Sequence, residues 1–336
     1  MQKKKTRPFV HPPHLSWKAQ LMAYIKARFD PKANGRYTAD LTKDAFKNNL
    51  FLTFRLLWQQ GYKVLPRNLR EKHVHLVARY WEQQGLSAST IQNRICTLRV
   101  FADQCIGKRG MVKRSAHYVR DRASVTRTYI PAEEKSWTRR GINPLTVIEF
   151  IAPYDSHVAL QLKMMHAFGL RCEEAVSIRP WRADFGDRLY VTEGTKGGRV
   201  RDITIRSVYQ RQVLDEAKQK VRGVRAFLGD PRYTQRQAIW HFANVLRRFG
   251  ITRKGLGITS HGLRHGWAND LCESLGWTPP LRQDKDTCPV LLSEDQVRQR
   301  LAQELGHNRK NVTSAYVGAR IRQPGSRPKT SRGLDK

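Results

Sequence analysis

A large excess of positive charge limits what this chain can fold into and what it can bind. The sequence has 62 Lys and Arg against 28 Asp and Glu, which gives a formal net charge of +34. Hydrophobic residues still make up 40% of the chain, so the composition excludes a disordered basic tail and predicts folded cores. Because a compact protein of this charge repels its own copies unless a polyanion neutralises it, nucleic acid is the first partner to expect.

A membrane is the weaker alternative for the partner. No apolar run approaches the roughly 18 residues that a spanning helix needs. The basic N-terminus also lacks the apolar stretch of a secretory signal. We therefore expect no membrane contact and a cytoplasmic protein associated with the nucleoid.

The five cysteines are scattered and form no C-x-x-C pair, which argues against a disulfide framework or a zinc site. We predict that most of them are small core residues.

Basic residues are spread over both halves of the chain, a distribution that suits two lobes facing one polyanion. The length of 336 residues also allows about two domains. We predict an N-terminal helical domain over residues 1–106, a basic linker or irregular insertion over 107–140, a second domain over 141–322 and a flexible basic tail over 323–336.

Helical periodicity dominates the first of these domains. Apolar residues recur at helical spacing over residues 41–60, and a second helix around 76–81 is closed by Gly85. A third helix is expected over 89–105, because Ser89 lies three residues before a glutamine in a capping-box pattern. These patterns predict a bundle of about four helices.

The polar face of the helix predicted over 89–105 is a candidate DNA-reading surface. Gln92, Asn93 and Arg94 lie on that face, and such side chains can reach base edges in the major groove. An ordinary amphipathic helix whose polar face meets only water explains the pattern equally well.

The second domain is predicted to combine helices with one hairpin. Asn143 followed by proline is a helix start signal. Residues 188–193 and 199–205 alternate in the manner of strands around a glycine-containing turn that carries Lys196. A last helix is expected to be capped by Asn311. The predicted fold class is mainly α with a small antiparallel β-hairpin.

Three short motifs in this domain could carry chemistry. FGLRCEEA places Arg171 at a helix opening, where free N–H groups and a guanidinium can bind phosphate. SHGLRHGWA puts His261 and Arg264 on one helix face, and LGHNRKNVTSAY places Tyr316 nine residues after His307. Each also has an ordinary interpretation, namely a surface ion pair, a solvated or satisfied histidine, or a tyrosine at the rim of the core.

Together these motifs resemble the two boxes of the tyrosine recombinase (phage integrase) family. The resemblance is specific over roughly residues 143–318. The helical first half is similar only in outline to the SAM-like core-binding domain of that family, so the implied fold is a SAM-like helical domain followed by a mixed α+β catalytic domain. The catalytic set that the resemblance implies is matched at six positions: Arg171, Lys196, His261, Arg264, His307 and Tyr316.

Two features depart from the family pattern. Arg264 and His307 are further apart than is usual in the family, and the surplus falls in residues 276–293. We interpret this segment as a surface insertion, since loops tolerate extra length at a small entropic cost. Phe168 stands where the family commonly has threonine, which would alter only the packing beneath Arg171.

The resemblance implies DNA strand cleavage and religation that needs no metal, cofactor or ATP. Arg171 and Arg264 would hold the non-bridging phosphate oxygens in the transition state. Tyr316 would attack in line to give a 3′-phosphotyrosyl link, and Lys196 would protonate the leaving 5′-oxygen.

The remaining implied roles concern histidines and further basic residues. His261 would take or relay the tyrosine proton, and His307 would hydrogen-bond the phosphate. Arg199 and Arg201 follow the hairpin lysine and are expected to contact DNA. His265 is interpreted as an ordinary satisfied histidine. No metal site is expected, because the histidines of these motifs lack matching carboxylates or thiolates.

The function that follows from the resemblance is that of a site-specific recombinase, an integrase of a mobile element. Its expected partners are double-stranded DNA, three further copies in a homotetramer on DNA, and accessory DNA-bending or directionality proteins. The alternative is a catalytically silent DNA-binding or architectural protein that has the same fold and charge. Such a protein would bind DNA with a steep salt dependence without cutting it.

Overall fold

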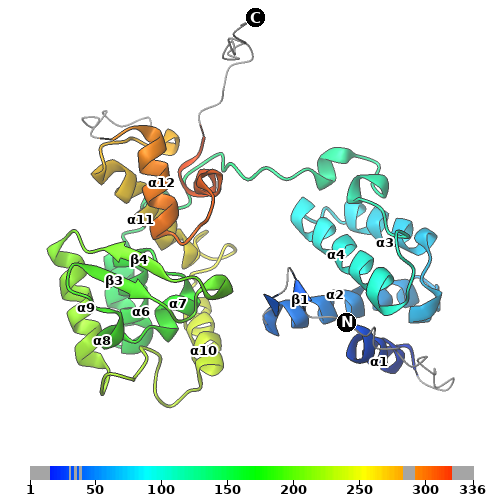
Figure 1. The fold of residues 1–336 in the computed structure, drawn as a ribbon, viewed down its shortest axis with the longest axis horizontal. Helices are drawn as coiled ribbons and strands as arrows, with labels where there is room; N and C mark the ends of the chain where they lie inside the picture. The colour runs from blue at the N-terminus through cyan, green and yellow to red at the C-terminus, as the bar shows by residue number, and fades with distance from the viewer. Residues whose placement is uncertain (1–15, 30–31, 34–35, 38–39, 283–291, 320–336) are drawn as a thin grey trace, which may run out of the picture. The chain divides into compact units, whose positions relative to one another are not determined.

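The computed structural model describes residues 16–29, 32–33, 36–37, 40–282 and 292–319. The chain divides into two compact units, Met1–Thr128 and Tyr129–Lys336 (Figure 1). The segment 107–140, predicted as a linker or insertion, is shared between them, and its larger part belongs to the first unit. Among the described residues, no helix combines the length and the hydropathy needed to cross a membrane.

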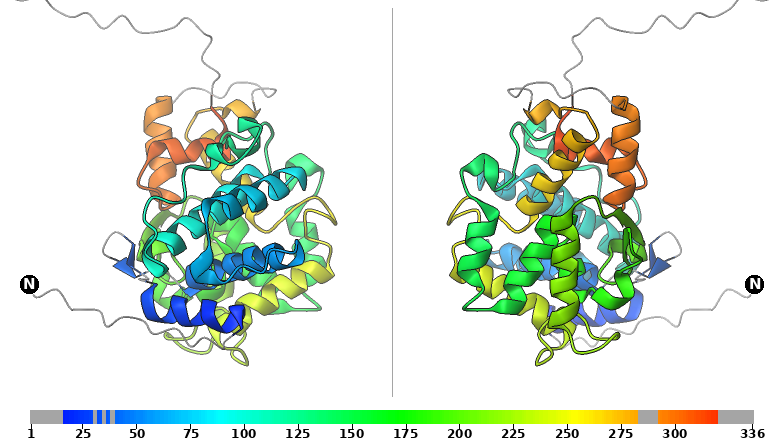
Figure 2. Two further views of the ribbon diagram at one scale, coloured as in Figure 1. Left: turned by 90° about the vertical axis from the view of Figure 1, so that its right-hand side faces the viewer. Right: turned by 90° about the vertical axis from the view of Figure 1, so that its left-hand side faces the viewer.

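The first unit is helical, with one short hairpin in its described part. Strand β1 (Lys32–Ala33) pairs antiparallel with β2 (Arg36–Tyr37). Helix α4 contacts both α2 and α3, and these helices lie side by side in the left view of Figure 2. The α-helices of this unit are α1 (Trp17–Arg28), α2 (Asp40–Gln59), α3 (Glu71–Gln83) and α4 (Ala88–Val100).

The core of the first unit forms where the apolar faces of its helices meet. Leu50 and Phe54 of α2 and Ile91 and Ile95 of α4 are completely buried, which confirms the predicted periodicity. After α4 the chain continues through a π-helical turn, η2 (Phe101–Cys105).

The chain beyond η2 folds back onto these helices. It includes two 3-10 turns, η3 (Ser115–His117) and η4 (Arg122–Val125). Tyr118 and Val125 are buried in the same core as the helices, with exposed fractions of 1% and 5%. This segment is therefore part of the first unit's packing.

Helix α4 starts earlier than the sequence pattern predicts. Ser87 is its N-cap, and the Ser87 hydroxyl accepts a hydrogen bond from the Thr90 amide at 3.3 Å. The predicted capping box of Ser89 with Gln92 is wrong, because Ser87 reaches the free amide first and Ser89 lies inside the helix.

The second unit is built around α6, which contacts α5, α7, α9 and α11. The predicted start of α5 is confirmed, since the Asn143 side chain accepts a hydrogen bond from the Leu145 amide at 3.0 Å. The green helices of this unit are seen in the right view of Figure 2. Its α-helices are α5 (Pro144–Ile151), α6 (Ser156–Phe168), α7 (Cys172–Ser177), α8 (Pro180–Ala183), α9 (Val208–Lys220), α10 (Gln235–Arg248), α11 (His261–Ser274), α12 (Glu294–Glu304) and α13 (Ser314–Val317).

A two-stranded antiparallel sheet interrupts the helices of the second unit. Strand β3 (Arg188–Val191) pairs with β4 (Arg201–Thr204), and Leu189 lies opposite Ile203. Both of these side chains are fully buried, as the alternating pattern predicts. The predicted fold class, mainly α with a small antiparallel hairpin, is confirmed.

The described part of the segment 276–293 is more than a surface insertion. Trp277 and Arg282 are both 5% exposed. The Arg282 guanidinium donates to Glu134 Oε1 and to Asp270 Oδ1, each at 2.7 Å, and to Glu273 Oε2 at 2.9 Å. Because this buried arginine joins α11 to the chain before α5, the segment helps to hold the second unit together. Cys288 lies outside the described residues.

Candidate active site

Arg171 is positioned by the tight turn between α6 and α7. Gly169 ends α6 in a left-handed conformation with φ 57°, and a Cβ there would lie 2.4 Å from the Trp267 ring. Only glycine fits this turn. Arg171 then becomes the N-cap residue of α7, as predicted, and its amide donates to Glu174 Oε2 at 2.7 Å.

Glu174 is the centre of a buried ion cluster. Its side chain is completely buried and accepts hydrogen bonds from Arg171 Nη1, at 2.5 Å, and from Arg201 Nη1. Arg264 Nη1 lies 3.9 Å from Glu174 Oε2. Burial alone would raise the pKa of Glu174, but the three guanidinium groups outweigh it and hold that pKa below its ordinary value. The carboxylate therefore stays ionised, and it is outnumbered by its cationic neighbours.

Carbonyl groups at helix ends hold the same arginines. Arg264 donates from Nη1 to the Gly169 carbonyl at 2.5 Å and from Nη2 to the Leu305 carbonyl at 2.7 Å. Arg171 Nη2 also donates to the Leu305 carbonyl, at 3.2 Å. These carbonyls follow the last turns of α6 and α12, where free acceptors and the negative end of the helix dipole favour cations.

Tyr316 lies beside this cluster on the short helix α13. It is 6% exposed, and its hydroxyl accepts a hydrogen bond from Arg264 Nε at 3.3 Å. The predicted cap Asn311 does not begin this helix, because residues 310–313 form the 3-10 turn η8, which leads directly into α13.

Three imidazole rings surround the phenol of Tyr316. The ring centroids of His261, His265 and His307 lie 5.8, 4.9 and 5.8 Å from that of Tyr316. His307 Nε2 and His265 Nδ1 are buried and form no hydrogen bond with any residue that the structure describes. Nitrogens of this kind remain available to a proton or a phosphate oxygen.

The surroundings keep these imidazoles neutral. Burial and the guanidinium groups of Arg264 and Arg171 lower the pKa of His261 to about 4 and that of His307 to about 4. Burial lowers the pKa of His265 to about 3, with a smaller contribution from His261. At neutral pH all three rings can accept a proton as well as donate one.

These depressed pKa values predict an acid-sensitive second unit. Unfolded histidine titrates near pH 6.5, so below that pH the unfolded chain binds protons that the buried ring of His265 does not. The contribution of this neutral ring to the unfolding free energy is complete above pH 6.5, and it is lost as the pH falls toward the folded pKa of about 3. Between pH 7 and 5 the wild type should lose up to about 2 kcal/mol more unfolding free energy than His265→Gln. Denaturant unfolding of both proteins measures this difference, and parallel pH profiles would contradict it.

Part of the second unit matches one known protein family. The family model described as "Integrase" matches residues 142–270, the stretch from the start of α5 into α11. This stretch, less than half of the chain, is therefore similar to the integrase, or tyrosine recombinase, family. Comparison with curated proteins gives no match.

Solved structures show that the integrase fold extends over most of the chain. A lambda integrase dimer bound to a COC′ core site is 15% identical, with a TM-score of 0.57, and the match covers 96% of this chain and 79% of that one. A lambda integrase tetramer bound to a Holliday junction is 15% identical, with a TM-score of 0.56, and the match covers 97% of this chain and 81% of that one. The Tn1549 transposon integrase in complex with transposon right end DNA is 15% identical, with a TM-score of 0.53, and the match covers 90% of this chain and 94% of that one.

The structure brings five of the six predicted catalytic residues of the second unit together and leaves the sixth apart. Lys196 is exposed in the turn η6 (Lys196–Gly198) between β3 and β4, and it forms no hydrogen bond or ion pair with the described residues. The base of this turn is fixed against α7, because a Cβ on Gly194 would lie 2.3 Å from the Glu173 carbonyl oxygen. Lys196 therefore sits on a projecting turn whose root adjoins the arginine cluster.

Of the two hairpin arginines expected to contact DNA, only one is accessible. Arg199 is exposed. Arg201 is 1% exposed and donates from Nε to the Glu304 carbonyl at 2.8 Å, in addition to its bond with Glu174. Its expected contact with DNA is therefore wrong for this structure. Burial and the neighbouring Arg264 lower the pKa of Arg201 to about 9, so it is still charged at neutral pH.

The predicted DNA-reading residues of α4 differ in how freely they can move. Gln92 donates to the Val125 carbonyl at 2.5 Å, and exposed Asn93 accepts from Arg127 at 3.0 Å. The Arg94 guanidinium lies over the Trp81 ring, 5.2 Å from its centroid. All three are engaged within the first unit, and their role in DNA contact stays a prediction.

Three residues of the site have places that the sequence did not predict: Glu174 was not singled out, Arg201 was expected to contact DNA, and His265 was interpreted as an ordinary satisfied histidine. Glu174 and Arg201 form the buried ion pair described above, and His265 is 7% exposed and faces Tyr316. A signal existed for Glu174, which lies three residues after Arg171 in the spacing of a capping box. His265 lies four residues after His261 and so shares its helix face.

Proposed function

We propose that this chain is a site-specific DNA recombinase that cleaves and rejoins strands through a 3′-phosphotyrosyl intermediate. The observation that carries the proposal is the charge around Tyr316. Three buried or half-buried guanidinium groups, those of Arg171, Arg201 and Arg264, surround one carboxylate, and Arg264 reaches the phenol oxygen. A buried site with unbalanced positive charge favours an anion, and a phosphodiester brings one negative charge.

The arginines retain donors for that phosphate. A guanidinium has five N–H groups in a fixed fork. Arg264 donates three of them, to the Tyr316 hydroxyl and to two carbonyls, and Arg171 donates two, to the Glu174 carboxylate and to the Leu305 carbonyl. The remaining donors, already held in place by the protein, are suited to the two non-bridging oxygens as charge grows on them in the transition state.

The proposed reaction is balanced without an external cofactor. The Tyr316 oxygen attacks phosphorus, the bond from phosphorus to the 5′-oxygen breaks, and a phosphotyrosyl ester forms. His261 takes or relays the phenol proton, and Lys196 gives a proton to the leaving 5′-oxygen. His307, whose buried Nε2 has no partner among the described residues, binds the phosphate. Attack by another strand's 5′-hydroxyl reverses these steps and reseals the DNA.

The proposal extends to assembly and to biological role. The solved integrases named above are described as bound to DNA, and lambda integrase is described as a dimer and a tetramer. By analogy we infer that this chain acts as a homotetramer on DNA and serves the integration or excision of a mobile element. Accessory DNA-bending or directionality proteins belong to the same inference.

Covalent capture on a nicked suicide substrate tests the proposal. The full chain is incubated with the substrate without Mg²⁺, and the reaction is resolved on a denaturing gel. We expect a protein–DNA adduct even without Mg²⁺, because the arginines of the site supply the positive charge that stabilises the transition state. A protein that only binds DNA would give a salt-sensitive shift on a native gel and no adduct, and that result would contradict the proposal.

A further inference from the structure

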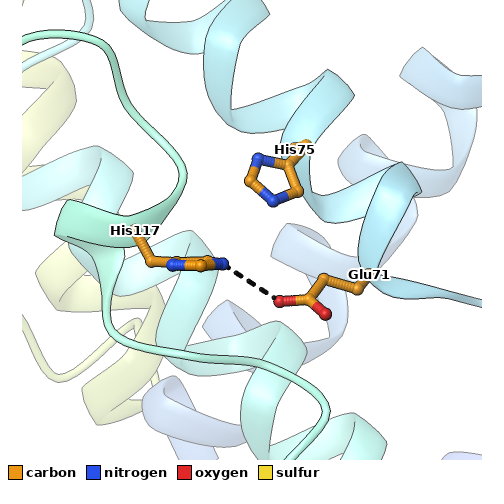
Figure 3. A group of neighbouring side chains, drawn as sticks. All are labelled: Glu71, His75 and His117. Atoms are coloured by element: carbon orange, nitrogen blue, oxygen red, sulfur yellow. Dashed lines mark ion pairs between the residues drawn. The ribbon is translucent and has the colours of Figure 1, made fainter.

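A second group of chemically versatile side chains lies in the first unit, apart from the arginine cluster. Glu71 and His75 are four residues apart on α3 and therefore share one face of that helix. His117 closes the 3-10 turn η3 and faces them from the chain beyond α4 (Figure 3). The three residues thus come from two segments that are distant in the sequence.

The three side chains point toward a common space. One ligand atom from each lies within 4.8 Å of the other two. His117 Nε2 is 3.2 Å from Glu71 Oε1, and the His75 and His117 ring centroids are 5.2 Å apart. Two ligands at about 2.0–2.1 Å from a tetrahedral zinc ion are about 3.3 Å from one another. Small side-chain rotations would therefore close this group around one ion.

A buried tyrosine holds the group in place. Tyr118 is 1% exposed, and its ring centroid lies 4.7 Å from that of His75 and 5.0 Å from that of His117. Its hydroxyl donates to Glu71 Oε1 at 3.4 Å and accepts from the Lys113 amide at 2.7 Å. Packing on the two rings and a bond to the carboxylate are the kind of support that orients metal ligands.

The ligand types select the class of ion. Two imidazole nitrogens and one carboxylate oxygen suit zinc and similar borderline cations, whereas magnesium and calcium prefer oxygen alone. We propose that Glu71, His75 and His117 bind one zinc-class divalent cation, with water at the fourth position, and that the ion clamps the segment 107–128 to α3. The absence of a metal site was predicted from the scattered cysteines and from the histidines of the catalytic motifs, and neither group includes these three residues.

Zinc binding by the full chain tests this inference independently of recombination. Protein freed of metal by a chelator and then dialysed is titrated with Zn²⁺ and compared with His117→Ala. The His117 side chain is 52% exposed, so its removal should leave the metal-free fold intact. We expect the wild type to bind one more equivalent of zinc than the variant. His157→Ala, a half-buried histidine of the second unit, is the matched control and should bind as the wild type does.

A proteolysis measurement tests the proposed clamp. Because the ion would join two segments of the first unit, zinc should slow cleavage within residues 107–128 in the wild type but not in His117→Ala. Equal zinc stoichiometry in the wild type, His117→Ala and His75→Ala would overturn the site and leave an ordinary ion pair between His117 and Glu71. Zinc binding with unchanged cleavage would overturn the clamp. A site that takes Co²⁺ or Ni²⁺ with the same variant dependence would support the proposed class of cation.

Discussion

Tyr316→Phe should abolish covalent attachment to DNA, lowering the rate by about a thousandfold or more, because the variant removes the attacking oxygen itself. The substitution retains the aromatic ring and hence its packing against His261, His265 and His307. It deletes one hydrogen bond, the one from Arg264 Nε to the hydroxyl at 3.3 Å. The measurement is the initial rate of adduct formation on the nicked substrate.

Two controls make this result specific to the hydroxyl. The affinity of the variant for the uncut DNA should stay within a few-fold of the wild type, since the basic surface is unchanged. Its unfolding free energy should change by about 1 kcal/mol, the usual net effect of one hydrogen bond. An adduct that formed at the wild-type rate in the variant would show that another side chain attacks.

Glu174→Gln should destabilise the second unit by about 3–5 kcal/mol, the usual cost of removing one partner from a buried ion pair. Amide and carboxylate have nearly the same shape, so packing is preserved while the negative charge is lost. Arg201 and Arg264, both buried, would then repel each other without compensation. Denaturant unfolding of the full chain measures the loss, and slower adduct formation should accompany it.

The neighbouring Glu173→Gln is the matched control for this charge removal. Glu173 is only half-buried, and its side chain forms no ion pair with the described residues, so we expect a change in unfolding free energy within about 0.5 kcal/mol.

The pH dependence of the stability that Glu174 provides has a definite sign. Because the pKa of Glu174 is lower in the folded state than its ordinary 4.5, its contribution is complete above pH 4.5 and is lost as the pH falls through the folded value. Equal stability of the two variants at pH 7 would refute the role given to Glu174.

Local signals were enough to predict much of the fold. The periodicity over residues 41–60 became α2, and Asn143 caps α5 as its sequence context indicates. The alternation on either side of Lys196 became the β3–β4 pair. In each case residues close together in the sequence determine the local structure.

Features that depend on distant contacts were not predictable in this way. Arg201 lies only two residues from exposed Arg199. It is buried because it donates hydrogen bonds to Glu174 and to the Glu304 carbonyl, which belong to other parts of the chain. The burial of Trp277 and Arg282 likewise depends on tertiary packing, which includes the bond from Arg282 to Glu134. Composition identifies such arginines as basic, and only the tertiary structure separates those that meet DNA from those that build the site.

The proposed function requires that the phenol held among these cations attacks the DNA backbone. The most direct test is to digest the covalent adduct with protease and nuclease and to find, by mass spectrometry, the amino acid that carries the nucleotide. We expect a single modified peptide in which Tyr316 bears a 3′-linked phosphate. Modification of any other residue, or a 5′-linked phosphate on Tyr316, would contradict it.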